Sequence, residues 1–177
     1  MKGVTLDTNK SKYHIHKKFV AVDVFEKLKN SIMDQDFPWR KRDQSTGWDH
    51  MYFTYNFYSY MNPSSDLYEP YIIPLLKQLE AKAPIQVRAN MFISDLFKAS
   101  SWHCDYDFKC TTAILYLNDC DGGTELKINN KIIFIKAVAN QMLVFDTDVK
   151  HRAITSKKES LRYVINFNYF TKGDECI

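Results

Sequence analysis

Apolar residues recur at helical spacing in two segments of the first half of the chain. In residues 23–36 they fall on one side of a helix, and the pattern stops before Pro38. A second helix is expected over about residues 66–82, where two prolines break or kink its early part. The segment between them, residues 50–60, reads HMYFTYNFYSY, and its aromatic content is typical of a strand.

From residue 85 onward the pattern changes to short strand-like segments separated by turn signals such as Asp-Gly-Gly. The segments are IQVRANMFI, TTAILYLN, TELKI, KIIFI, QMLVF, HRAIT and LRYVINFNYF. Short strands at this spacing, without helices between them, indicate an antiparallel sandwich or jelly roll. We therefore predict a mainly β fold with N-terminal helices (α+β), in which residues 1–84 form a helical and aromatic support for a β core over residues 85–171.

Length and composition are typical of one soluble domain spanning residues 1–177. Of the 177 residues, 45% are hydrophobic and 25% charged, and there is no apolar run of about 18 residues to cross a bilayer. The N-terminal segment lacks the apolar core of a signal peptide, so we expect a cytoplasmic protein without a membrane partner. In that reducing compartment the four cysteines are expected to be free thiols, and their spacing matches no zinc template.

The net charge of +3 is too small to argue for nucleic acid by itself. Two basic clusters, at residues 39–42 and 150–158, are short and are most simply interpreted as solvated surface. Nucleic acid therefore stays an alternative partner that charge alone does not favour.

Candidate chemistry begins in the stretch WHCDYD, residues 102–107. In extended backbone, residues two apart point to the same side, so His103 and Asp105 can hold one metal ion together. A second histidine, His151, opens a later strand. Two histidines and one carboxylate form a facial triad that leaves open positions and suits Fe(II), although zinc accepts the same ligands.

A fourth residue, Arg162, lies in the last strand. Alternation places Arg162, Asn166 and Asn168 on one face of that strand. In an ordinary β-sandwich this face of the strand is exposed to solvent. If it faces the interior instead, the guanidinium needs an anion, and a bidentate carboxylate fits best. A dicarboxylic cosubstrate bound to the metal at one end and to Arg162 at the other meets both requirements.

These residues resemble the ligand and cosubstrate set of the Fe(II)/2-oxoglutarate-dependent dioxygenases. Within that superfamily, TTAILYLNDCDGGTELKI resembles the prolyl hydroxylase segment with a Tyr-Leu-Asn strand end and a Gly-Gly turn, and RYVINFNYF resembles the last core strand of the oxygen-sensing prolyl hydroxylases. Small bacteriophage-encoded oxygenases are similar in length and layout, which implies the host cytoplasm. The resemblance covers about residues 86–170 and implies a double-stranded β-helix, a jelly-roll or cupin-like core.

The resemblance implies a hydroxylase that uses Fe(II), 2-oxoglutarate and O2, acts on a protein or peptide side chain, and releases succinate and CO2. It gives six residues a role: His103, Asp105 and His151 as iron ligands, Arg162 as the partner of the distal carboxylate of 2-oxoglutarate, Tyr116 as a hydroxyl on that carboxylate, and Asn90 as a polar group directed toward cosubstrate or substrate.

Two positions depart from the family pattern. Phe92 stands where a tyrosine often contributes a hydroxyl, and Asn168 stands where the oxygen-sensing enzymes carry a tryptophan. One alternative is an AlkB-type nucleic-acid dealkylase, which the basic clusters and Asn90 favour. Those enzymes resemble one another in a second arginine six residues after the first, a position held here by Asn168. The other alternative is a non-catalytic β-sandwich binding module, which would be expected to have lost at least one of the four key residues.

Overall fold

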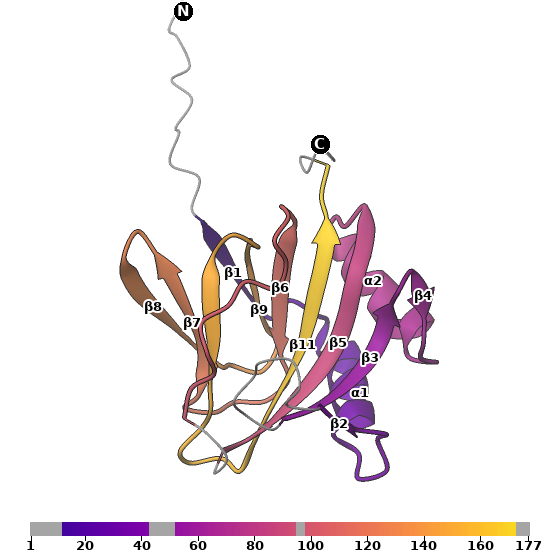
Figure 1. Cartoon of the computed structure of the whole chain (residues 1–177). Helices are drawn as coiled ribbons and strands as arrows, with labels where there is room; N and C mark the ends of the chain where they lie inside the picture. Colours follow the sequence, from indigo (N-terminus) through magenta and orange to yellow (C-terminus); the bar gives the residue numbers. More distant parts are fainter. Residues whose placement is uncertain (1–11, 43–51, 95–97, 173–177) are drawn as a thin grey trace, which may run out of the picture.

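The computed structural model describes residues 12–42, 52–94 and 98–172 (Figure 1). The N-terminal segment on which the expected cytoplasmic location rests lies largely outside these ranges. The first half contains β1 (Tyr13–Lys17), α1 (Val22–Met33), β2 (Arg40–Lys41), β3 (Tyr52–Ser59), β4 (Asn62–Pro63), the π-helical turn η2 (Tyr68–Ile72) and α2 (Ile73–Gln78). The second half contains β5 (Ala83–Ile93), β6 (Thr111–Tyr116), β7 (Gly123–Ile128), β8 (Lys131–Lys136), β9 (Gln141–Asp146), β10 (Lys150–Ile154) and β11 (Leu161–Phe170).

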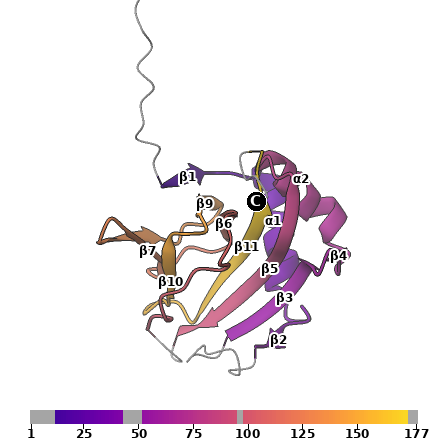
Figure 2. The same ribbon diagram turned by 45° about the horizontal axis from the view of Figure 1, so that its top comes forward.

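The strands form two antiparallel sheets. The larger sheet has the order β1-β9-β6-β11-β5-β3-β2, with β4 paired to β3, and the smaller has the order β10-β7-β8. Two isolated β-bridges attach the segment after β5 to the free edge of β10. They pair Ala99 with Ile154 and His103 with His151. Figures 1 and 2 show the smaller sheet on one side of the larger sheet and both helices on the other.

Each face of the larger sheet has its own apolar core. On the helix side, Phe25, Leu28 and Ile32 of α1 are buried in the cluster that also contains Ile165 and Phe167 of β11. A second cluster fills the space between the sheets, and its members come from both. They are Tyr52, Phe92, Ile114, Tyr116, Cys120, Leu126, Ile135, Ala137, Leu143, Phe145, Val149 and Val164.

Strand β11 alternates as its sequence predicts. Tyr163, like Ile165 and Phe167, belongs to the helix-side core, whereas Val164 belongs to the core between the sheets. Because successive side chains of a strand point to opposite faces, Arg162 points into the space between the sheets. The interior alternative for this arginine is therefore the correct one, since only 2% of Arg162 is exposed.

The predicted mainly β, jelly-roll architecture with N-terminal helices is confirmed, but the second helix is shorter than expected. Pro74 has no N–H to continue an α-helical pattern, the preceding turn is π-helical, and Glu80 follows with a left-handed φ of 56°. Strand β1 was not expected, and it contributes to the larger sheet together with β3. Among the described residues, no helix has the length and apolar character needed to span a membrane.

Candidate metal centre

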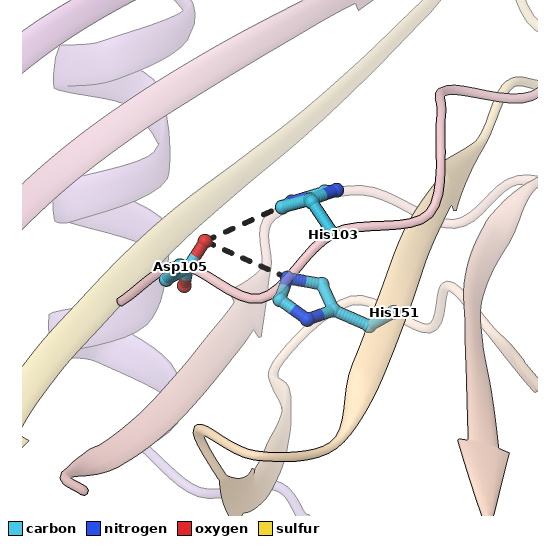
Figure 3. Close-up of side chains that lie close together, drawn as sticks. All are labelled: His103, Asp105 and His151. Atoms are coloured by element: carbon cyan, nitrogen blue, oxygen red, sulfur yellow. Dashed lines mark ion pairs between the residues drawn. The ribbon is translucent and has the colours of Figure 1, made fainter. Parts of the chain in front are cut away.

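His103, Asp105 and His151 converge at one edge of the space between the sheets (Figure 3). Their candidate ligand atoms all lie within 4.8 Å of one another. The Oδ1 atom of Asp105 lies 3.7 Å from Nε2 of His103 and 3.6 Å from Nε2 of His151. The structure therefore brings together the three residues that the sequence suggested as a facial triad.

Backbone pairing fixes the two histidines relative to each other. The amide N–H of His103 donates to the carbonyl of His151 (3.1 Å), and the N–H of His151 donates back to the carbonyl of His103 (2.9 Å). This reciprocal pair joins a loop to strand β10, although the two residues are far apart in the chain. The imidazole rings consequently lie with centroids 4.4 Å apart.

Each histidine is oriented by a backbone carbonyl. Nδ1 of His103 lies 3.0 Å from the carbonyl oxygen of Ser101, and Nδ1 of His151 lies 3.3 Å from that of Val149. A carbonyl only accepts, so each Nδ1 carries a proton and each Nε2, which faces Asp105, is the atom placed to bind a metal. Burial, together with the neighbouring His151, lowers the pKa of His103 to about 4, so this imidazole is neutral at neutral pH.

The carboxylate of Asp105 is held through its other oxygen. Oδ2 accepts hydrogen bonds from Nδ2 of Asn168 (2.8 Å) and from Oγ1 of Thr112 (3.3 Å). Burial by itself raises the pKa of Asp105, but His151, the bond from Asn168 and His103 outweigh it and bring the pKa below its ordinary value. Asp105 is therefore an anion with Oδ1 available beside the two imidazoles.

A cavity leads from this cluster to Arg162, a buried guanidinium with incomplete hydrogen bonding. Its Nη2 donates to Oγ1 of Thr124 (3.2 Å), whereas Nε and Nη1 have no hydrogen-bond partner among the described residues. The rings of Phe92 and Tyr116 lie 5.0 and 5.6 Å from its central carbon. Burial lowers the pKa of Arg162, yet a guanidinium remains charged, so this end of the cavity contains a cation that no described carboxylate contacts.

The remaining two predicted residues occupy different positions. Asn90 lines the cavity, and its Oδ1 has no hydrogen-bond partner among the described residues. Tyr116 is fully buried, and its hydroxyl donates to Oγ1 of Thr124 (2.8 Å). Thr124 lines the cavity and links Tyr116 to Arg162. A direct bond from Tyr116 to a carboxylate stays a prediction.

Several contributing residues were missed by sequence reasoning. Asn168 was noted only as a departure from the family, although alternation already placed it on the face of Arg162. Thr112 reaches Asp105 because its strand neighbours β11, and Thr124 reaches Arg162 across the gap between the sheets. A fourth residue, Arg88, lines the cavity from β5. Alternation along β5 puts Arg88 on the face of Asn90, a local signal that sequence reasoning did not use. No local signal identifies Thr112 and Thr124, because their roles depend on long-range pairing.

The fold is that of the 2-oxoglutarate and Fe(II) oxygenases, as solved structures show at low sequence identity. No protein-family model matches the sequence, and neither does any curated protein. A Pseudomonas putida prolyl-4-hydroxylase superposes with a TM-score of 0.68 at 13% identity, over 90% of this chain and 92% of that chain. The resemblance inferred from the sequence is thus confirmed at the level of fold, and the similarity to bacteriophage enzymes stays a prediction.

Two further structures were solved with bound molecules. A prolyl hydroxylase from Trichoplax adhaerens, in complex with a peptide fragment of the hypoxia-inducible factor oxygen degradation domain, has a TM-score of 0.70 at 15% identity, over 94% of this chain and 86% of that chain. HygX from Streptomyces hygroscopicus was solved with nickel, 2-oxoglutarate and hygromycin B. It has a TM-score of 0.64 at 9% identity, over 92% of this chain and 84% of that chain. One fold therefore accommodates both a peptide and a small-molecule ligand.

Proposed function

We propose that this chain is an Fe(II)- and 2-oxoglutarate-dependent dioxygenase, a single domain that hydroxylates a side chain of a protein or peptide. The observation that carries the proposal is the buried, incompletely bonded guanidinium of Arg162 in the same cavity as the His-Asp-His cluster. A metal site alone is compatible with several activities. A metal site that shares its cavity with a cation lacking an anion specifically suits a cosubstrate with carboxylates at both ends.

The cluster fits Fe(II) in donor chemistry. His103 and His151 would each supply a neutral Nε2, and Asp105 would supply Oδ1, which leaves other coordination positions open to cosubstrate and O2. The outer hydrogen bonds to Ser101, Val149 and Asn168 would hold these ligands in orientation. When bound, iron and 2-oxoglutarate supply the oxidation of the substrate by O2, with release of succinate and CO2.

Arg162 fits the distal carboxylate of 2-oxoglutarate, because its two unpartnered nitrogens can donate to both oxygens of one carboxylate. Thr124 adds a donor to the same place. Its Oγ1 already accepts from Arg162 and Tyr116, so its own proton could donate to a cosubstrate in the cavity that Thr124 lines. The rings of Phe92 and Tyr116 would exclude water from this end of the cavity.

A protein or peptide substrate is favoured over a methylated nucleic acid by the role of Asn168. The position where AlkB-type enzymes carry their second arginine is used here to hold Asp105, through a hydrogen bond of 2.8 Å. The peptide complex of the Trichoplax prolyl hydroxylase supports the same substrate class.

The described cysteines, Cys104, Cys110 and Cys120, are free thiols, which supports a cytoplasmic location.

The proposal is tested by measuring succinate formed from 2-oxoglutarate on exposure of the anaerobically purified, Fe(II)-loaded protein to O2. Wild type is expected to form succinate in a metal- and O2-dependent reaction that the His103→Ala and Arg162→Ala variants lack. If wild type forms no more succinate than the variants and binds no 2-oxoglutarate, a non-catalytic binding module becomes the better interpretation. Binding without turnover would indicate an obligatory substrate.

Removing the amide that holds Asp105 is expected to weaken metal binding without abolishing it. In Asn168→Ala, Oδ2 of Asp105 keeps only the longer bond from Thr112, so the carboxylate loses its fixed orientation. Loss of one such outer contact costs about 10- to 100-fold in metal affinity. Chelator competition measures the change, and Asn30→Ala on the exposed surface of α1 is the matched control. An unchanged metal affinity would mean that Asn168 plays no part in orienting Asp105.

The hydroxyl of Thr124 is expected to contribute to cosubstrate binding. Thr124→Val keeps the side-chain shape but removes the donor, so the dissociation constant for 2-oxoglutarate should rise about 10- to 100-fold, as for a hydrogen bond to a charged group. Calorimetry with the metal-loaded protein measures this constant. Thr124→Ser should restore binding, and Thr111→Val on β6 should not alter it. Equal affinities in Thr124→Val and wild type would exclude the proposed contact.

A further inference from the structure

Arg88 is a second arginine that faces the cluster and that the proposed function does not use. It lies on β5, an interior strand of the larger sheet, where it pairs in register with Asn166 of β11 and Asn56 of β3. Its Nε is buried and has no hydrogen-bond partner among the described residues. Like Arg162, it is therefore a cation with a buried hydrogen-bond donor that no described residue satisfies.

Arg88 stands at the junction of two hollows. It lines the cavity that contains Arg162, and it also lines an adjoining open groove that ends at His103 and Asp105. The groove is the larger of the two and is also lined by Arg42. A molecule lying in the groove would consequently reach the candidate ligands past Arg88, whereas the cavity that contains Arg162 suits the cosubstrate.

The groove is positive and rich in polar side chains. Among the described residues its charged side chains other than the histidine are Arg42, Arg88 and Asp105, and this carboxylate is directed toward the histidines. Thr54, Asn56 and Gln86, from β3 and β5, add hydroxyl and amide groups to its wall. Such groups can pair with the N–H and C=O groups of an extended polypeptide.

Charge balance points to the missing partner, an argument that depends on the proposed function. With both histidines binding as neutral ligands, Asp105 is the one anionic ligand that the described residues offer a divalent metal, and the two carboxylates of 2-oxoglutarate would offset the remaining metal charge and Arg162. No carboxylate among the described residues then pairs with Arg88, which is half-buried and whose Nε is buried without a hydrogen-bond partner. Because an unsatisfied buried donor is costly, an anion on a bound molecule would complete the site.

We infer that the groove binds the primary substrate through an acidic side chain that pairs with Arg88, so that the substrate is a polypeptide segment with Asp or Glu close to the residue that is oxidised. A carboxylate on a short flexible stem can reach a recessed guanidinium and bind it in a bidentate manner. A nucleic-acid phosphate lies between two sugars, and its binding relies on many exposed cations. Here the described groove offers only Arg42 and Arg88.

The inference is tested with matched peptide pairs that differ only by Glu against Gln, or Asp against Asn, beside a varied central residue. Binding is measured by fluorescence anisotropy on the full chain loaded with Ni(II) and 2-oxoglutarate, so that no turnover is needed. The tightest peptides are expected to be acidic and to weaken at least about tenfold on the amide swap. In Arg88→Gln this preference should disappear, in Arg88→Glu it should shift to basic peptides, and in Arg40→Gln, on the exposed strand β2, it should persist.

The opposite results are equally specific. The inference is overturned if wild type shows no acidic preference, if Arg88→Gln retains it, or if a single-stranded oligonucleotide rather than an acidic peptide occupies the groove. It is also overturned if Arg88→Gln weakens 2-oxoglutarate binding alone, since Arg88 would then serve the cosubstrate. Thermal stabilisation of the peptide-free protein by metal and 2-oxoglutarate is recorded separately, and its absence in wild type would contradict the proposed function itself.

Discussion

Replacing Arg162 with methionine is expected to abolish the thermal stabilisation that 2-oxoglutarate gives to the metal-loaded protein. At a ligand concentration about 100 times its dissociation constant, binding stabilises the wild type by about 2.7 kcal/mol, which for a chain of this size raises Tm by about 5–10 °C. Arg162→Met removes the donors for the distal carboxylate and leaves an apolar wall. The Tm of the variant should therefore be the same with and without 2-oxoglutarate.

The ligand-free variant provides an internal check on folding. The guanidinium of Arg162 is buried with two unpartnered nitrogens, so an apolar side chain of similar length should leave Tm unchanged or raise it. Scanning calorimetry with Ni(II) in place of iron measures both quantities, and Arg40→Met on the exposed strand β2 is the control. A full response to 2-oxoglutarate in Arg162→Met would refute the assigned role, and a marked fall in ligand-free Tm would indicate a structural role.

Removing the charge of Asp105 is expected to have the largest effect on metal binding. Asp105→Asn conserves the size of the side chain but replaces the anionic Oδ1 that lies within 3.7 Å of both histidine Nε2 atoms. The loss should exceed the roughly 10- to 100-fold that an outer contact costs, because a directly coordinating group is removed. Succinate formation should fall below detection.

The same stretch of sequence offers a matched control. Asp107 lies two residues further along, and its side chain is exposed. Asp107→Asn makes the same chemical change and should leave metal affinity and succinate formation at wild-type values. Fe(II) affinity is measured by chelator competition under anaerobic conditions. If both variants behave alike, the carboxylate at Asp105 is not a ligand and the triad has to be reassigned.

The parts of the site that sequence reasoning anticipated are those governed by local geometry. His103 and Asp105 are two residues apart, so extended backbone directs both side chains toward the same metal ion. Alternation along β11 directs Arg162 into the space between the sheets. The apolar stripe of α1 likewise determines which face of the helix packs on the sheet. Each of these follows from residues within a few positions of one another.

The remaining features depend on contacts between distant segments. Strand β1 is established by pairing with β9 and by Asn140, whose side chain bonds both the N–H and the carbonyl of Val20. The bond between Thr124 and Arg162 exists because two sheets face each other. Register across many residues of chain determines such pairs, so no short pattern in the sequence encodes them.

The reciprocal backbone bonds between His103 and His151 have a consequence for how the centre acquires its ion. They join two of the three donors through main-chain pairing, so the apoprotein is expected to fold first and to receive the metal into a finished site. A preformed set of nitrogen and oxygen donors follows the general order of divalent affinities, in which nickel and copper exceed iron. Which ion occupies the centre in a cell would then be decided by supply during and after synthesis, and incorrect metallation would yield a stable but inactive protein.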